Sequence, residues 1–565
     1  MAGEAVTLQL GQFAGCVGTH WWGLQAAALR SPAETPELHP AALLRPGRAA
    51  GGRETHTPRL VALELKGGLG ALGPRGAGAE AAAAWDGAVA DYLEHTPTGG
   101  SAAGDAGRRT EGVSSDRPGG PSSAGQGVSP APSQLTVSQD VSLGSSRQVW
   151  SDYLNMHLHP KSVYVIPQYM HDGDCGCLEA FGQGESLLQD PGCLEELEDR
   201  LHFYVEECDY LQGFQVLCDL HNGFSGVGAK VTELLCDEYS GKGILTWGLT
   251  PVTSNVGDSQ KNFYRLMNTA LGIVHLSSHS SLFCPLSLSG SLGIRPRPPV
   301  SFPYINYDAS LNYHSSAILA AVLDTLTAPY RLSSFQGSMM HLAETLNFSG
   351  RKVVAAWASV PFPALRGCSL FDTLCTYKQD VPWKLLSSCR EQKVSCCFAQ
   401  SVVLRGICKE SHLSCSGKQP ESLLHMWEST EQILQRYLHT VFPGAFSTAL
   451  VLEQPCHTQP PYPQFFSPLL TREGFLLDRP PRYPSAAVES IPVLAALQAS
   501  PVLHTLLYSL YKDLQKLNTQ RWASFFSAGV EHDDFQEALE QLRTLSQCYE
   551  TGFEADESED EGDSD

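Results

Sequence analysis

An apolar segment in the middle of the chain, Gly213–Leu220, runs into a glycine-rich turn, His221–Gly228, and then into a helical pattern over Ala229–Tyr239. The chain begins in the same way, with the apolar run Val6–Leu10 before the turn Gly11–Gly18. Strands that alternate with helices form mostly parallel sheets, because each helix returns the chain by a right-handed crossover. The sequence therefore predicts an α/β fold.

Further segments extend this alternation along the chain. A second strand-and-helix set is expected after Val353. The segment Ser315–Leu326 is long and apolar enough to be the central core helix of the fold. The remaining predicted elements are the strands Arg59–Leu65, Ser162–Gln168 and Gly243–Leu249, and the helices Leu194–Cys208, Leu503–Leu517 and Asp533–Tyr549.

Composition divides the 565 residues into parts. Gly, Ser, Pro and Ala dominate residues 97–147, which cannot bury enough apolar area to offset chain entropy, so we expect a disordered insertion there. The acidic tail, 551–565, should be solvated and disordered as well. The expected division is an N-terminal part of the first domain (1–96), the insertion (97–147), the rest of that domain with the core helix (148–330), an intermediate domain (331–490), C-terminal helices (491–550) and the tail (551–565).

Charge and cysteine usage exclude several classes of protein. With 38 basic and 60 acidic residues the formal net charge is −22, which disfavours binding to nucleic acid or to anionic lipid. The N-terminal residues match neither a secretory signal nor an Arg-rich presequence, so we expect the 17 cysteines to be reduced cytosolic thiols. Because no run of about 18 apolar residues occurs, any membrane association is expected to be peripheral.

Chemical motifs are sparse. The two glycine-rich turns suit an anion cradle at a helix N-terminus or, equally, a tight turn, and neither fits the GxGxxG or P-loop spacing. No GxSxG motif supports a serine hydrolase. We expect no metal site, because the spacing of the closest His and Cys residues matches no tetrahedral zinc pattern; these residues are His157, His159, His171, Cys175 and Cys177.

Several stretches resemble tubulin. Leu8–Trp22 is similar to its first phosphate loop, and Glu207–Gln215 is similar to the segment before its glycine signature loop. Val360–Pro363 and Val403–Gly406 resemble parts of its second domain, and Gly529–Ala538 with the following helix and acidic tail resembles its C-terminus. The likeness covers most of the chain apart from the insertion.

The Trp21–Trp22 pair and the long insertion narrow the resemblance to the Misato family, tubulin-related proteins of mitochondrial distribution and morphology. The resemblance implies a tubulin/FtsZ-like α/β fold. That fold would have a nucleotide-binding-like parallel-sheet domain, a second α/β domain and C-terminal helices.

Some residues differ from those of tubulin at positions that serve nucleotide binding there. Phe224 and Val227 stand in a signature loop that is almost all glycine in tubulin, and their side chains are expected to crowd a phosphate cradle. Glu64 keeps one of two acids that serve the nucleotide's magnesium, whereas Lys66 replaces the other and cannot ligate Mg²⁺. Lys66 could instead neutralise a phosphate directly, so this change affects the magnesium site more than phosphate binding itself.

The resemblance also places a catalytic loop at Leu346–Lys352, where Ser349 and Lys352 stand in the positions of tubulin's acids. Because water activation needs a base there, we expect no catalytic residue and no GTP hydrolysis. Binding of GTP or GDP without hydrolysis stays open. Asn268 and Asn312 match the base-contacting asparagines, with ordinary capping or turn roles as the alternative. The vestigial guanine-nucleotide site would comprise Gly11, Gln12, Glu64, Gly223, Asn268 and Asn312.

The resemblance thus implies a non-enzymatic regulator of mitochondrial distribution, morphology and fusion. It would act in the cytoplasm and at the cytosolic face of the mitochondrial outer membrane, through protein partners on that surface. The alternative is an assembly factor for microtubules that associates with tubulin or the cytosolic chaperonin; an active polymerising GTPase is disfavoured. Ser558, followed by three acidic residues, is a candidate phosphorylation site.

Overall fold

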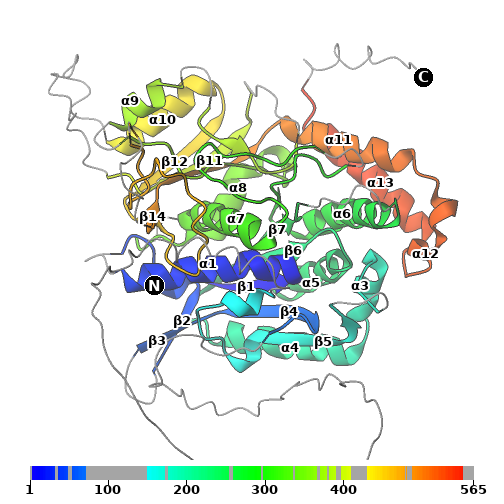
Figure 1. Cartoon of the computed structure of the whole chain (residues 1–565). Helices are drawn as coiled ribbons and strands as arrows, with labels where there is room; N and C mark the ends of the chain where they lie inside the picture. Colours follow the sequence, from blue (N-terminus) through cyan, green and yellow to red (C-terminus); the bar gives the residue numbers. More distant parts are fainter. Residues whose placement is uncertain are drawn as a thin grey trace, which may run out of the picture.

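Figure 1 shows the computed structural model of the chain. The predicted insertion at 97–147, the tail beyond residue 551 and the candidate phosphosite Ser558 lie outside the residues described below. Those residues are 3–31, 36–48, 54–70, 149–171, 176–252, 259–293, 297–334, 337–365, 369–377, 381–389, 396–408, 429–477, 479 and 487–551.

The first domain is built on a six-stranded sheet in which every neighbouring pair is parallel. The central strands β1 and β6 are buried along their whole length, as expected for a sheet covered by helices on each side. This confirms the α/β prediction. In order across the sheet the strands are β5 (Val163–Met170), β4 (Leu60–Lys66), β1 (Glu4–Leu10), β6 (Leu211–Asp219), β7 (Gly243–Leu249) and β8 (Leu282–Leu286).

Helices cover both faces of this sheet (Figure 1). One core contains α1 (Gln12–Arg30) and α7 (Asn312–Leu326), which pack side by side; the opposite core contains α4 (Pro191–Glu206), α5 (Phe224–Glu238) and α6 (Ser259–His279). All of α7 is buried except Asn312 and His314, which confirms the predicted central core helix. Two shorter helices, α3 (Phe181–Leu187) and α8 (Met339–Leu346), complete the set.

The second domain has a mixed five-stranded sheet in the order β10 (Lys384–Leu385), β9 (Ala355–Ser359), β15 (Val493–Ala499), β11 (Ala399–Arg405) and β12 (Phe446–Leu452). β15 pairs with both β9 and β11, so this sheet continues past the boundary expected at residue 490. Residues 493–499, which we assigned to the C-terminal helices, therefore belong to the second sheet, and the helical part begins at Val502. The helices α9 (Leu370–Cys375) and α10 (Thr430–Val441) belong to this domain, and two small ladders, β2 (Leu44–Arg48) with β3 (Glu54–Pro58) and β13 (Cys456–His457) with β14 (Ser490–Ile491), lie outside both sheets.

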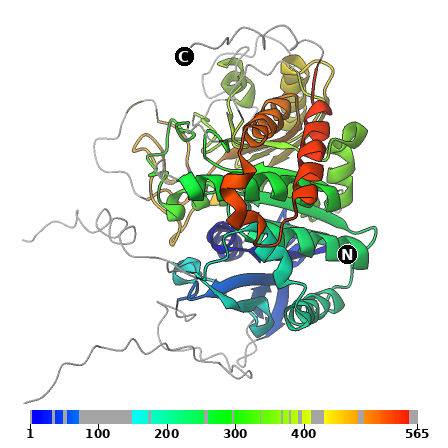
Figure 2. The ribbon, with the colours of Figure 1, turned by 90° about the vertical axis from the view of Figure 1, so that its right-hand side faces the viewer.

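The C-terminal helices are α11 (Val502–Gln515), α12 (Ala523–Phe526) and α13 (His532–Gln547), close to the predicted ranges. They stand together on one side of the molecule, facing the viewer in Figure 2. The Tyr549 hydroxyl fixes their end to the strand region: it donates to the Val353 carbonyl at 2.7 Å and accepts from the Val353 N–H at 2.9 Å. None of the helices in the described ranges is long and apolar enough to cross a bilayer.

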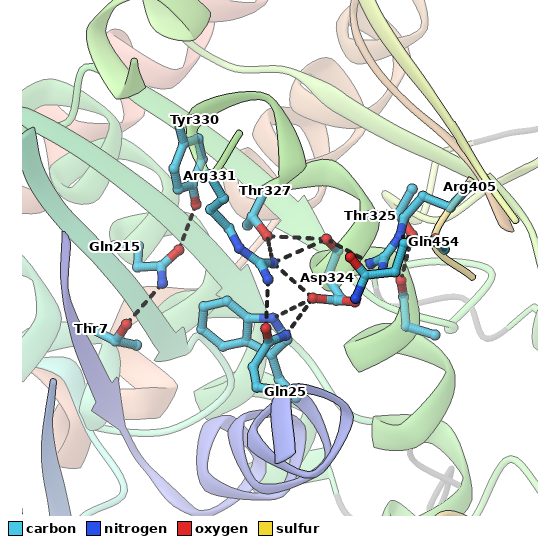
Figure 3. Close-up of polar contacts among 12 residues, drawn as sticks. Thr7, Gln25, Gln215, Asp324, Thr325, Thr327, Tyr330, Arg331, Arg405 and Gln454 are labelled. Atoms are coloured by element: carbon cyan, nitrogen blue, oxygen red, sulfur yellow. Dashed lines mark hydrogen bonds and ion pairs between the residues drawn. The ribbon is translucent and has the colours of Figure 1, made fainter. Parts of the chain in front are cut away.

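A buried ionic network joins α1, α7 and the second sheet (Figure 3). Asp324 near the end of α7 accepts hydrogen bonds from Arg331, at 2.7 Å, and from Arg405 at the end of β11. Trp21 and Gln25 on α1 donate to the same carboxylate. Burial alone would raise the pKa of Asp324, but the charges of Arg405 and Arg331 outweigh it and hold that pKa well below its usual range.

Candidate functional site

The predicted site residues gather mainly where β1, β4 and β6 end. Gly11 and Gln12 follow β1, Glu64 lies near the end of β4, and Gly223 follows β6. The carboxyl ends of neighbouring parallel strands share one edge of a sheet, which is where open α/β sheets bind ligands. The structure thus brings four of the six predicted residues to one edge.

Asp219, the last residue of β6, fills the N-terminus of α1. Its carboxylate accepts hydrogen bonds from Phe13 N–H at 3.0 Å and Ala14 N–H at 2.8 Å, and the residue is fully buried. Gly11, the residue just before α1, has no side chain with which to cap the helix, and its φ of 106° favours glycine. A Cβ there would lie 2.5 Å from Asp219 Oδ2. The anion position of α1 is therefore taken by a carboxylate of the chain itself.

Burial raises the pKa of Asp219 to about 7, although the Phe13 and Ala14 amides favour its ionised form. Burial likewise raises the pKa of Glu64 to about 8. Both Glu64 oxygens already accept hydrogen bonds, Oε1 from Leu65 N–H at 2.8 Å and Oε2 from Trp150 Nε1–H at 2.7 Å. Both oxygens of Glu64 are thus committed to contacts within the chain.

The second glycine-rich turn is shorter than predicted, because α5 begins at Phe224 rather than at Ala229. Its glycines allow α3 to pack closely: a Cβ on Gly226 would lie 1.9 Å from the Phe181 carbonyl, and one on Gly184 would lie 1.9 Å from the Gly223 carbonyl. The α5 N-terminus is capped locally, since Phe224 N–H donates to Asn222 Oδ1 at 3.0 Å. These glycines therefore serve helix packing.

The side chains of Phe224 and Val227 point into the hydrophobic core and are at most 1% exposed. Both were expected to crowd a phosphate cradle. The contacts that close the turn come instead from α3 and from Asn222.

The two predicted base-reading asparagines have different surroundings. Asn268 is fully buried on α6; its Oδ1 accepts from Phe181 N–H at 2.8 Å, and its Nδ2 donates to the Glu179 carbonyl at 2.6 Å and the His221 carbonyl at 3.3 Å. The Asn268 amide thereby joins the loop before α3 to the turn after β6. Asn312 is exposed at the first turn of α7.

The predicted catalytic loop lies at the opposite edge of the first sheet. Lys352 contacts the beginning of β8, where its carbonyl accepts from Phe283 N–H at 2.9 Å, and its Nζ donates to the Ser278 carbonyl at 3.1 Å. Ser349 is exposed and has a positive φ of 56°. Lys66 is exposed at the end of β4. The structure does not bring Ser349 or Lys352 to the predicted nucleotide residues of the same chain.

Sequence reasoning missed Asp219 and Trp150, the two side chains that complete this edge. An acid at the end of an otherwise apolar strand was a usable signal for Asp219. Within the described ranges, no cluster of three or more His, Cys, Asp or Glu side chains could hold a metal ion. In this conformation the residues do not fit a nucleotide phosphate at the α1 amides, because Asp219 already accepts from them.

The sheet order, the long buried α7 and the turns at the strand ends define a tubulin-like α/β protein. Comparison with known families agrees: the Tubulin domain family matches residues 141–332, and the Misato Segment II tubulin-like domain family matches residues 3–102. The chain is 52% identical to Protein misato homolog 1 of Homo sapiens, with 98% of each chain covered. It is 43% identical to Protein misato homolog 1 of Danio rerio (99% of each) and 28% identical to Protein misato of Drosophila melanogaster (97% and 98%). The chain belongs to the Misato family.

Proposed function

We propose that this chain is a non-catalytic, tubulin-related regulator of mitochondrial distribution, morphology and fusion that acts from the cytosol at the mitochondrial outer membrane. The mitochondrial part of the proposal rests on the resemblance to the Misato family. The non-catalytic part rests on Asp219, whose carboxylate accepts from the α1 amides that a nucleotide phosphate would need.

Phosphate would have to displace the buried Asp219 side chain, and the two hydrogen bonds that this side chain accepts from the α1 amides would be lost. Glu64 and Asn268 add to this obstacle because their polar atoms are already used within the chain. We therefore expect that neither GTP nor GDP binds in this conformation, because the chain's own side chains already occupy the hydrogen-bonding groups at this edge of the sheet.

Purified protein is expected to carry no guanine nucleotide and to leave GTP intact. The measurement is chromatography of the supernatant after acid denaturation, together with phosphate release from added GTP. Stoichiometric GTP or GDP in the denatured sample would contradict the occupied α1 terminus. GTP turnover that falls when Ser349 is substituted would contradict the non-catalytic assignment.

Association with mitochondria is expected to be peripheral, because the sequence has no apolar run of about 18 residues. Carbonate at high pH should release the protein from isolated mitochondria, and protease added to intact mitochondria should digest it. Retention in the carbonate pellet would contradict peripheral binding. Protein found only with tubulin or chaperonin, in cytosol freed of mitochondria, would favour the assembly-factor alternative.

A further inference from the structure

The two main sheets have four edge strands, and three of these carry features that hinder pairing with another chain. β5 contains Pro167 and pairs irregularly with β4. β8 contains Pro285, and the segment around Val353 pairs with its outer side. β10 is only two residues long. Prolines, irregular pairing, covering segments and short length are the usual means by which proteins protect sheet edges.

The fourth edge strand is β12, which forms one margin of the second sheet (Figure 1). Its sequence, Phe-Ser-Thr-Ala-Leu-Val-Leu, contains no charged residue and no proline. All seven residues pair with β11 without a shift in register. β12 therefore lacks the protective features of the other three edges. An edge of this kind can pair with the backbone of another polypeptide.

The backbone groups of β12 alternate in direction along the strand. The N–H of Phe446 donates to the Phe398 carbonyl at 3.1 Å, toward β11. Alternate residues of a parallel ladder bond to the same neighbour, so Ser447 and Ala449 direct their N–H and C=O groups away from β11. In the described parts of the chain, β12 pairs with β11 alone. Ser447 and Ala449 therefore offer both donors and acceptors to an added strand.

Exposure to solvent decreases along β12. Phe446 is 59% exposed, the next four residues are half-buried, and Val451 and Leu452 are at most 2% exposed. The accessible part of the edge is therefore its first part, residues 446–450. A neighbouring strand there would cover the exposed ring of Phe446, and such cross-strand contacts of aromatic with aliphatic side chains stabilise sheets.

We propose that β12 binds an extended segment of another protein, which adds a strand to the second sheet beside residues 446–450. The paired part of this segment would be uncharged, like β12 itself, and would place an aliphatic residue beside Phe446. Basic residues flanking it would be attracted by the net charge of −22 on this chain. Such binding needs neither a nucleotide nor a particular place in the cell, so it does not depend on the function proposed above.

A second copy of the chain fits this edge less well. A twofold axis would pair the two β12 strands antiparallel. The accessible start of each strand would then lie beside the buried end of the other, Val451 and Leu452. Each copy also carries a net charge of −22, and like charges oppose association. A short segment of another protein meets neither obstacle.

The probe for the test is the labelled synthetic peptide Lys-Lys-Leu-Thr-Val-Thr-Leu-Lys-Lys. Its sequence is the same in both directions, so a leucine lies beside Phe446 whether the added strand is parallel or antiparallel. Fluorescence anisotropy with the full chain should show saturable binding, with a dissociation constant on the order of 0.1 mM. Bound peptide should also slow hydrogen exchange of the backbone amides of residues 446–450.

The control peptide has N-methyl groups on its central residues, from the first leucine to the second. It keeps the charges and side chains but cannot donate backbone hydrogen bonds, so it should bind at least about tenfold more weakly. Three results would overturn the proposal: no saturable binding, equal affinity for the methylated peptide, or slowed exchange in other segments but not in β12.

Variants of β12 locate the binding. Ala449→Pro removes an N–H that points away from β11, and Ala449→Ser, which keeps this N–H, is its matched control. The proline variant should bind the peptide at least about fivefold more weakly, and the serine variant should bind it as the wild type does. Sedimentation of the chain without peptide should show a monomer. A dimer that Ala449→Pro dissociates would assign the edge to a second copy and overturn the proposal.

A second pair of variants keeps the test valid if Ala449→Pro lowers the melting temperature. Phe446→Ala removes only an exposed ring and should weaken peptide binding about fivefold, because the leucine of the peptide loses its apolar neighbour. Its matched control is Tyr210→Ala, which removes a 63% exposed ring just before β6 and should leave the affinity unchanged. Wild-type affinity in Phe446→Ala would place the peptide elsewhere, and the proposal would fail.

Discussion

Replacing Asp324 with asparagine is expected to lower the free energy of unfolding by about 3–5 kcal/mol, the usual effect of removing one partner from a buried ionic contact. The variant keeps the shape of the side chain but leaves Arg331 and Arg405 buried without their shared counter-charge. Because these residues join α1, α7 and β11, the loss should reach both sheets. Chemical denaturation followed by circular dichroism and by tryptophan fluorescence would measure it.

The control for this experiment is Glu196→Gln, which removes an exposed partner of Arg200 on α4. Its effect should stay below about 1 kcal/mol, as for other surface ion pairs. Adding Arg405→Met to Asp324→Asn should recover part of the loss, because one uncompensated charge is then removed. An Asp324→Asn variant as stable as the control would show that the network contributes little.

Replacing Asp219 with alanine is expected to have two effects. The buried Phe13 and Ala14 amides lose their acceptor, which should lower the free energy of unfolding by about 1–3 kcal/mol. The vacated α1 terminus should also gain affinity for anions, because helix N-termini bind phosphate through such amides. Millimolar phosphate should therefore raise the melting temperature of the variant and leave that of the wild type unchanged.

Glu64→Gln is the matched control, since it neutralises a nearby buried acid without freeing the α1 amides. It should show no response to phosphate. If phosphate stabilises the wild type as much as it stabilises Asp219→Ala, the N-terminus of α1 is already open in the wild type. The assignment of the protein as nucleotide-free would then fail.

Local sequence patterns predicted most of the first domain, because its strands and helices differ clearly in apolar periodicity. The start of α5 was misplaced by the glycines near Phe224, which suggest a loop when read in sequence alone. Their reason is tertiary: α3 packs against them so closely that a Cβ would not fit. The last strand of the second sheet, Val493–Ala499, was missed because it follows a long stretch with few regular elements.

Four of the six residues predicted for a nucleotide site lie at one edge of the first sheet, but the contacts that they make within the chain could not be read from the sequence. Asp219 caps a helix that begins about 200 residues earlier in the chain, and Asn268 holds the loop before α3. The cap of a helix is usually predicted from residues next to that helix in the sequence. A cap supplied by another strand becomes visible only when the sheet order places β6 beside β1.

That sheet order also has a consequence during synthesis. β1 lies between β4 and β6, and its first residue, Glu4, pairs with Leu211. At roughly 5–20 residues per second, the ribosome needs on the order of 10–40 s to make β6 after β1. Throughout that interval β6 does not yet exist, so the apolar β1 has one edge without its partner strand. The nascent chain is therefore exposed to aggregation before its first domain can close.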